Sequence, residues 1–250
     1  MIVGRQVIYL PRVTSTMEEI ERYAAAGEPE GVVVVADEQT AGRGRSGRTW
    51  RAPAGSSILC SILLRPKLFA DHLTTIPLIA GVAVAEAIEE HVPVRCHLKW
   101  PNDVWIDSKK VAGILMTSRM NSSGVAHVNL GIGVNVTVPR EALPDGATSL
   151  DAASGCNVAR DRLLTSLLTR LDAHYACLLT NGPHSGLSAW RGRAALIGEH
   201  VVVKAEDREE TGRFVGIDDD GALLLAQDGG TKRIVAGDLT RGPRALEQTP

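Results

Sequence analysis

The sequence predicts an α+β protein in which a large domain of short strands and a few helices precedes a small all-β barrel. The chain has 250 residues, of which 44% are hydrophobic and 22% charged, as in globular proteins with one large domain or a large and a small one. Strand-like runs alternate with helical periodicity over most of the chain. After Trp190 only strand patterns of about five residues remain.

The first part of the chain alternates between the two kinds of element. A helix is expected at 16–26, because Ser15 and its neighbouring threonines can cap its N-terminus and Gly27 can end it. An apolar helix is expected at 75–90, with Pro77 tolerated in its first turn. The expected strands are 6–10, 31–36 and 57–64.

The second part reads as a run of strands, one long helix and the barrel. Leucines at three- and four-residue spacing predict an amphipathic core helix at 160–180. The domain boundary is placed near Ile197, where the helical pattern stops. Three strands are expected at 95–106, 111–117 and 125–136, with turns at 107–108 and 121–124. The expected barrel strands are 201–205, 212–217, 222–225 and 231–235.

Composition argues against several classes of protein. The formal net charge of −2 gives no reason to expect tight binding of nucleic acid or a membrane. No apolar run is long enough to cross a bilayer, and the N-terminus lacks a secretory signal, so the cytoplasm is the default location. The four cysteines lie far apart without a CxxC pair, which argues against a zinc site and a disulfide framework.

The strongest local signal is the run GRGRSGRTW at residues 42–50. Four arginines at 43, 45, 48 and 51 share a glycine-rich loop with no acid among them, so they repel one another unless an anion arrives. Glycines allow close backbone approach, and guanidinium groups suit phosphate or carboxylate. We therefore expect a mobile loop that becomes ordered when it binds such a ligand.

The same loop matches other motifs. Its glycines satisfy GxGxxG and its end nearly spells a P-loop, but the residues that follow have loop composition, so no helix N-terminus is available for phosphate. An arginine-rich surface loop without a role and a basic arm on RNA or DNA are the other two alternatives. The single aromatic Trp50 offers little stacking surface for nucleic acid.

Two downstream segments also carry chemistry. In KWPNDVWIDSKKVAGIL, residues 99–115, two lysines stand near Asn102 and Asp103, a set that fits phosphate and magnesium, although an Asx turn after Pro101 is an alternative. In GIGVNV, residues 131–136, the glycines should clear a patch on the face to which Asn135 points. In the first of these segments, Gly113 would let a ligand or a strand lie close against the backbone. A bulge is the alternative at both Gly113 and Gly133.

Four motifs in these segments, in this order and spacing, resemble the catalytic motifs of biotin protein ligases over nearly the whole chain: GRGRSGRTW, KWPNDVW, KVAGIL and GIGVNV. The resemblance implies a mixed β-sheet flanked by helices, similar to class II synthetases, at 1–196 and an SH3-like β-barrel at 197–250. It implies that biotin and ATP form biotinyl-5′-AMP with magnesium, and that biotin then passes to one lysine of a biotin carboxyl carrier domain of a carboxylase. Lipoate or octanoate ligases and transferases have a similar catalytic domain and are the nearest rival.

The resemblance also implies roles for individual residues. Lys110, Arg45 and Arg48 are the expected catalytic residues, and Asn102 and Asp103 the expected magnesium ligands. The expected biotin-binding residues are Ser15, Thr16, Gln39, Gly42, Arg43, Gly44, Arg45, Lys110, Gly113 and Gly133. The expected ATP-binding residues are Arg45, Arg48, Lys99, Asn102, Asp103 and Asn135.

Two departures from the family pattern stand out. Met17 follows the Ser-Thr pair where many members have asparagine, so we expect it to pack rather than to donate a hydrogen bond. The first strand starts near Gln6, which leaves no room for the winged helix of bifunctional members, so we expect no operator binding. The acceptor carboxylase, the base of the second step and the oligomeric state, a homodimer included, are left open by the sequence.

Overall fold

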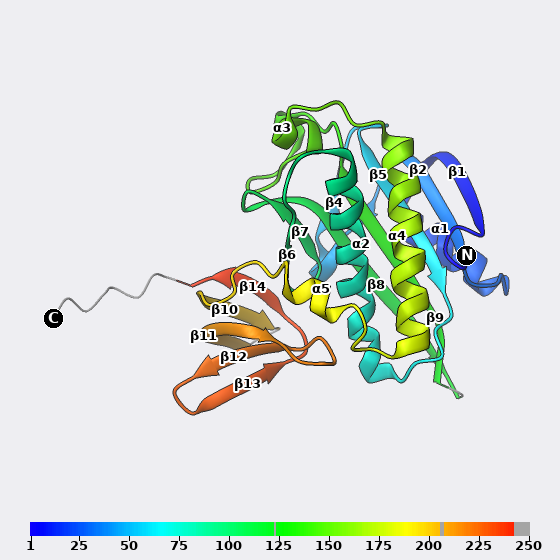
Figure 1. Cartoon of the computed structure of the whole chain (residues 1–250). Coiled ribbons are helices and arrows are strands. Elements are labelled where there is room, and N and C mark those ends of the chain that lie inside the picture. Colours follow the sequence, from blue (N-terminus) through cyan, green and yellow to red (C-terminus); the bar gives the residue numbers. More distant parts are fainter. Residues whose placement is uncertain (123, 206–207, 243–250) are drawn as a thin grey trace.

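The computed structural model describes residues 1–122, 124–205 and 208–242. A mixed seven-stranded sheet with helices on both faces forms the large domain, and a small antiparallel sheet lies beside one end of it (Figure 1). Position 123 of the expected turn and residues 243–250 of the expected second domain lie outside the described residues. The α+β class and the mixed sheet flanked by helices are confirmed.

The large sheet has the strand order β1-β2-β5-β9-β8-β7-β6. Only the β1–β2 pair is parallel, with Gln6 opposite Val32, and all other neighbours are antiparallel. The strands are β1 (Gln6–Val13), β2 (Val32–Gln39), β5 (Ser57–Leu64), β6 (His97–Lys99), β7 (Asp103–Ile106), β8 (Lys109–Asn121) and β9 (Gly124–Asn135).

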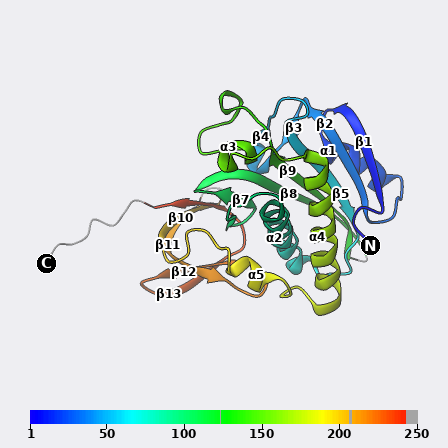
Figure 2. The same cartoon turned by 45° about the horizontal axis from the view of Figure 1, so that its top comes forward.

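Alternation along the buried strands assigns each face of the sheet to its helices. On β2, Val33 and Val35 belong to the main core with α2 (Thr75–His91) and α4 (Arg160–Asn181). Val32 and Val34 point the other way and pack with Ile20 of α1 (Thr16–Ala25). This is the period of two expected of a strand buried on both faces. Figure 2 shows α2 and α4 side by side against the sheet.

Helix α2 explains the most apolar part of the chain. Within the described residues, the segment Ala70–His91 is the one helix long and apolar enough to cross a membrane, but 72% of its apolar window is buried inside the protein. It packs between the sheet and α4, and Pro77 lies in its first turn as expected. A helix that is apolar all round fits this central place in the core.

The C-terminal part folds as an antiparallel sheet of five strands in the order β13-β12-β11-β10-β14. The expected small all-β domain is confirmed, but among the described residues its sheet does not close into a barrel, because β13 and β14 form two open edges. The strand β14, which the sequence did not predict, continues the sheet beyond β10. The strands are β10 (His200–Ala205), β11 (Arg208–Ile217), β12 (Leu223–Gln227), β13 (Gly230–Ile234) and β14 (Asp238–Arg241).

The expected single strand at 95–106 is wrong, and the difference shapes the candidate site. The segment 95–106 is a hairpin of β6 and β7 in which Lys99 lies opposite Asp103. Pro101 has no backbone N–H to donate to a neighbouring strand, and it favours a turn. The apolar residues on both sides of it made the whole segment look like one strand. The indole of Trp100 in this turn donates to the carbonyl of Gly221, 3.0 Å away, and so ties the turn to the C-terminal sheet.

The sequence also missed several short elements. A two-stranded hairpin and five short helices connect the main elements, and most of these are too short to show a hydrophobic period. They are β3 (Gly42–Arg43), β4 (Thr49–Trp50), α3 (Leu150–Ser154), α5 (Leu187–Arg191) and the 3-10 helices Arg45–Gly47, Ala70–Thr74 and Arg140–Ala142.

Candidate active site

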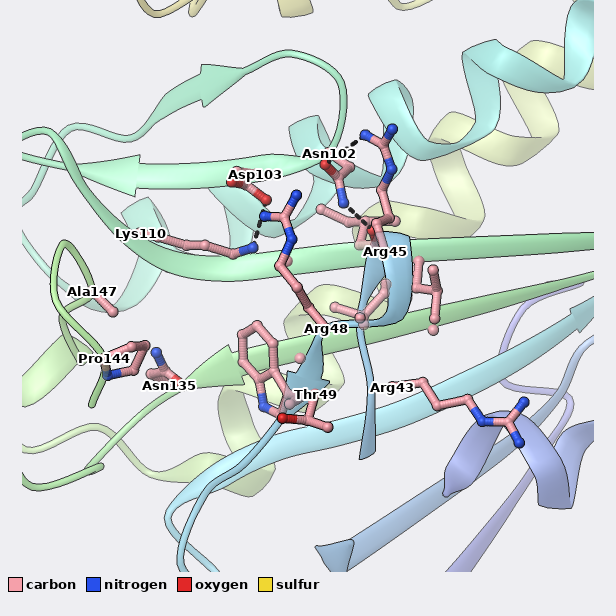
Figure 3. A pocket seen from close by; sticks show the side chains of 18 of the residues that line it. Arg43, Arg45, Arg48, Thr49, Asn102, Asp103, Lys110, Asn135, Pro144 and Ala147 are labelled. Atoms are coloured by element: carbon pink, nitrogen blue, oxygen red, sulfur yellow. Dashed lines mark hydrogen bonds and ion pairs between the residues drawn. The ribbon is translucent and has the colours of Figure 1, made fainter. Parts of the chain in front are cut away.

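A cavity of about 810 Å³ opens between the large sheet, the β3–β4 hairpin and the edge of the C-terminal sheet. Every residue that the sequence assigned to biotin or ATP lines it, except Gly42. Figure 3 shows the side chains from the different elements converging on this space. A cavity of this size suits a ligand larger than one small metabolite.

One end of the cavity is formed by the start of α1. Ser15 caps this helix, because its hydroxyl accepts a hydrogen bond from the backbone N–H of Met17. Thr16 donates from its backbone N–H and its hydroxyl to Oε1 of Gln39, at 2.8 and 3.0 Å. Ser61 of β5, which the sequence did not single out, donates to the Thr16 hydroxyl at 2.8 Å. This end therefore has a fixed, buried polar chain.

Met17 lines the same end and is 8% exposed. A Cβ added at Gly131 would lie 2.8 Å from its sulfur, so the thioether fills the space that this glycine leaves. Packing is thus the role of Met17 in this structure. The patch that Gly131 was expected to clear is therefore occupied by the Met17 side chain.

The arginine loop is the tip of the β3–β4 hairpin. Gly42 pairs with Trp50, and a Cβ at Gly42 would lie 2.4 Å from the carbonyl oxygen of Trp50, so only glycine fits there. The tip contains one 3-10 turn, Arg45–Gly47, with Ser46 at a φ of 52°. No α-helix follows it, which removes the dinucleotide-fold and P-loop interpretations.

The structure corrects the expectation that the loop arginines lack counter-ions. Arg48 forms an ion pair with Asp238 of β14, and the Arg45 guanidinium lies 3.8 Å from the same carboxylate. Arg45 also donates to Oδ1 of Asn102 at 3.2 Å. An acid distant in the sequence, Asp238, therefore supplies the counter-ion for this part of the loop. Burial lowers the pKa of Arg45, while Asp103 opposes this change and the neighbouring Arg48 adds to it.

Arg43 behaves differently from the other two arginines. Its guanidinium pairs with Glu18 on α1 and its side chain is 59% exposed. Figure 3 shows it pointing toward that helix and away from Lys110. Arg43 belongs to the cavity wall but does not join the cluster of cations.

Lys110 and Asp103 form the centre of the site. The Lys110 ammonium lies 2.6 Å from Oδ1 of Asp103 (Figure 3). The Lys99 ammonium lies 3.9 Å from Oδ2 of the same carboxylate. Lys99 is also 5.1 Å from the centroid of the Trp105 ring. Desolvation lowers the pKa of Lys99, while Asp103 opposes that change and the neighbouring cations add to it.

A β-bulge brings Lys110 into the cavity. Val104 lies opposite Ala112 and Trp105 opposite Lys110, so β8 holds one extra residue, Val111. Residues 110 and 113 would face opposite sides of a regular strand, but the bulge puts them on the same face. Accordingly, a Cβ at Gly113 would lie 3.0 Å from the Lys110 nitrogen. The bulge interpretation and the close-approach interpretation thus both hold in this segment.

Trp50 fills the gap above the two glycines. A Cβ at Gly133 would lie 2.7 Å from the Trp50 indole, and one at Gly113 would lie 3.0 Å from it. The Lys110 ammonium is 5.7 Å from the indole centroid. The indole N–H of Trp50 is buried and has no hydrogen-bond partner among the described residues. Sequence reasoning quoted Trp50 within its motif but gave it no place in the site.

Two asparagines complete the centre. The amide nitrogen of Asn102 donates to the carbonyl of Ile114 at 2.6 Å, which fixes its oxygen toward Arg45. Asn135 points into the cavity wall, and its amide nitrogen donates to the carbonyl of Thr148 at 3.1 Å.

Two parts of the cavity wall were missed by the sequence. Residues 142–147 lie along the wall because the backbone of Lys110 bonds to Gly146 and Thr148. The C-terminal sheet supplies the other part, which consists of Lys204, Asp238, Leu239 and Thr240. Neither segment carries a motif, and only the tertiary fold brings them to the site.

The donor set does not fit a resident magnesium ion. Within the described residues no group of three His, Cys, Asp or Glu side chains could hold a metal. Asp103 is paired with Lys110, and the Asn102 oxygen accepts from Arg45. Magnesium commonly arrives on nucleotide phosphates with one or two protein carboxylates as ligands. A magnesium ion here would be part of a nucleotide substrate.

Comparison with known protein families decides the class of this site. The model of the biotin/lipoate A/B protein ligase family matches residues 9–135. The chain belongs to this family. The biotin protein ligase C terminal domain matches residues 196–239, a range that begins just before β10 and extends into β14.

Individual members of the biotin/lipoate A/B protein ligase family are similar to almost the whole chain. A biotin–acetyl-CoA-carboxylase ligase of Paracoccus denitrificans is 36% identical, with 93% of this chain and 99% of the relative covered. The bifunctional ligase/repressor BirA of Bacillus spizizenii is 35% identical, with 96% and 75% covered. The structure of biotin protein ligase from Aquifex aeolicus in complex with biotin and ATP superimposes with a TM-score of 0.83 at 32% identity, covering 95% of this chain and 100% of that chain.

Proposed function

We propose that this protein joins biotin to ATP, forming biotinyl-5′-AMP and pyrophosphate, and then transfers biotin to a lysine of a biotin carboxyl carrier domain of a carboxylase. The observation that carries the proposal is the convergence of Lys110, Arg45 and Arg48 on one cavity that also has a closed, buried polar end. The names of the relatives in two organisms and the bound molecules of the Aquifex structure support it.

The polar chain at the start of α1 suits the ring of biotin. In that position Thr16 and Gln39 offer fixed hydrogen-bonding groups, and Met17 offers an apolar wall. The valeryl chain would run past the indole of Trp50 toward Lys110. Its carboxylate would then reach the cation cluster, where ATP would present its α-phosphate.

The first step brings two anions together. A carboxylate oxygen of biotin attacks the α-phosphorus, the new C–O–P bond forms, and the bond to the β-phosphate breaks to release pyrophosphate. Lys110, Arg45 and Arg48 stabilise the negative charge that grows in this transition state, and this electrostatic term is commonly the largest one in such catalysis. No nucleophile from the protein is needed.

The second step uses the partner's amine. The carrier lysine attacks the carbonyl of the mixed anhydride, AMP leaves, and the amine loses a proton as the amide forms. Closure of the β3–β4 hairpin over the adenylate would keep water away until the carrier arrives. We propose that this happens in the cytoplasm.

The rival within the same family is the ligation of lipoate. Calorimetric titration with biotin and with lipoate separates these two activities. Biotin should bind the empty protein, and ATP with magnesium should then bind the biotin-loaded protein more tightly than the free one. Mass spectrometry should then find one biotin on a carrier domain incubated with the enzyme. Binding of lipoate but not biotin would reject the proposal in favour of the rival.

A further inference from the structure

Asp238 of the C-terminal sheet joins two arginines of the large domain. It is the first residue of β14, and its carboxylate forms an ion pair with Arg48 and lies 3.8 Å from the Arg45 guanidinium. Its side chain is 33% exposed and lines the cavity. The contact therefore crosses from one domain to the other inside the candidate active site.

Gly237, the residue before Asp238, also contacts Arg45, through its backbone carbonyl. The carbonyl of Gly237 accepts a hydrogen bond from Arg45 at 3.2 Å. Gly237 has a φ of 148°, and a Cβ there would lie 2.8 Å from a methyl of Val203 and 3.0 Å from the carbonyl oxygen of Lys204. A side chain at this position would be strained and crowded, so the glycine allows this approach of the backbone to Arg45.

The surroundings explain why two arginines need a carboxylate there. Arg45, Arg48, Lys99 and Lys110 all line the cavity, and their mutual repulsion would spread flexible side chains apart. Arg48 is 61% exposed, and Asp238 is its one ion-pair partner among the described residues. A carboxylate that forms ion pairs with both guanidinium groups offsets this repulsion and holds them side by side.

We propose that Asp238 is a positioning residue, which holds Arg45 and Arg48 in place to receive the phosphates of ATP. The C-terminal sheet thereby completes the ATP half of the site, without touching biotin. This inference rests on the proposed function. It differs from a role as a competing counter-ion, in which Asp238 would occupy the place of a phosphate and its loss would tighten ATP binding.

The test compares Asp238→Asn and Asp238→Glu with the wild type and with Asp219→Asn. Asp219 is a matched control, because it is an ion-paired acid of the same sheet domain whose partner is Arg191. We expect Asp238→Asn to raise the KM for ATP about tenfold or more, since a charge-assisted contact to each arginine is lost. Biotin affinity should stay within twofold, Asp238→Glu should recover part of the loss, and Asp219→Asn should match the wild type.

A double-mutant cycle shows whether Asp238 acts through the arginine. The effect of Asp238→Asn should be much smaller in the Arg48→Ala background than in the wild type, because contacting residues are not additive. Thermal melts of all variants identify any that fail to fold, and Asp238→Glu then serves as the folded comparison.

Three outcomes would overturn the proposal. They are a wild-type KM for ATP in Asp238→Asn, a lower KM in that variant, and full additivity with Arg48→Ala. If the wild-type protein forms biotinyl-AMP while any of these is found, the positioning role is wrong and the proposed function stands. If the wild type forms no adenylate, the proposed function itself is wrong.

Discussion

The Lys110 ammonium lies 2.6 Å from the carboxylate of Asp103, although Lys110 is the second residue of β8 and Asp103 is the first residue of β7. The pair depends on the extra residue in β8, which turns Lys110 toward the face of Gly113. Asp103 thus keeps a lysine pointed into the cavity, next to arginines that would otherwise repel it. This arrangement makes Lys110 the first residue to test.

Replacing Lys110 with alanine should suppress formation of the adenylate by about two to three orders of magnitude, as expected for the loss of a donor aimed at developing charge. Arg45→Ala should act in the same direction. Pyrophosphate release in the presence of biotin and ATP measures the effect. Lys109→Ala is the matched control, because Lys109 is the exposed neighbour on the same strand. Wild-type release by Lys110→Ala would remove Lys110 from the mechanism.

The polar chain at the start of α1 gives a second prediction. Thr16→Val removes the hydroxyl that accepts from Ser61 and donates to Gln39. Leaving a buried hydroxyl without its hydrogen-bond partner costs about 1–3 kcal/mol, so the free energy of unfolding should fall by that amount. Biotin binding should also weaken. Thr40→Val, at an exposed position with one long contact of 3.5 Å, should change neither. Equal biotin affinities of the two variants would contradict this role for Thr16.

A third prediction concerns the glycine under Trp50. Gly133→Ala would place a methyl 2.7 Å from the indole, so Trp50 must move out of its place in the cavity. We expect the free energy of unfolding to fall by about 1–3 kcal/mol, as for overpacked cores, and biotin affinity to fall with it. Urea denaturation measures the first effect. Gly229→Ala is the control, since a Cβ there meets nothing within 4 Å. A stable Gly133→Ala variant with normal affinity would show that the contact is not needed.

The cysteines give a fourth prediction, based on burial. Burial raises the pKa of Cys60 and of Cys96 to about 12 in each case. At pH 8 only about one in ten thousand of these thiols would be a thiolate, and the thiolate is the reactive form. Cys156 and Cys177 are partly exposed. A thiol reagent should therefore label two cysteines in the native protein and four in denaturant, and fast labelling of Cys60 would contradict the described core.

Local patterns were enough to predict the main elements. The capping serine at Ser15, the glycine after α1 and the leucine spacing of α4 are signals within a few residues of each other, and all three appear in the structure. The strand limits were less well predicted. Both β1 and β2 extend three residues beyond the expected ends at Leu10 and Ala36, because pairing continues into polar sequence.

Contacts between distant segments could not be predicted. Arg45 and Gly237 are 192 residues apart in the sequence, and no local pattern relates them. The expectation of unpaired loop arginines was wrong for this reason, since their carboxylate lies on the strand that the sequence missed. Similarly, the motif residues Gly113 and Gly133 were found from spacing, while the indole that packs on both could be found only from the fold.

The exchange of labelled pyrophosphate into ATP tests the central claim most directly, because it reports the reversible formation of an acyl adenylate in one cavity. With the wild-type protein and magnesium, we predict exchange that appears only when biotin is added and that is nearly lost in Lys110→Ala. Exchange that occurs with lipoate and not with biotin, or that persists in Lys110→Ala, would contradict the account.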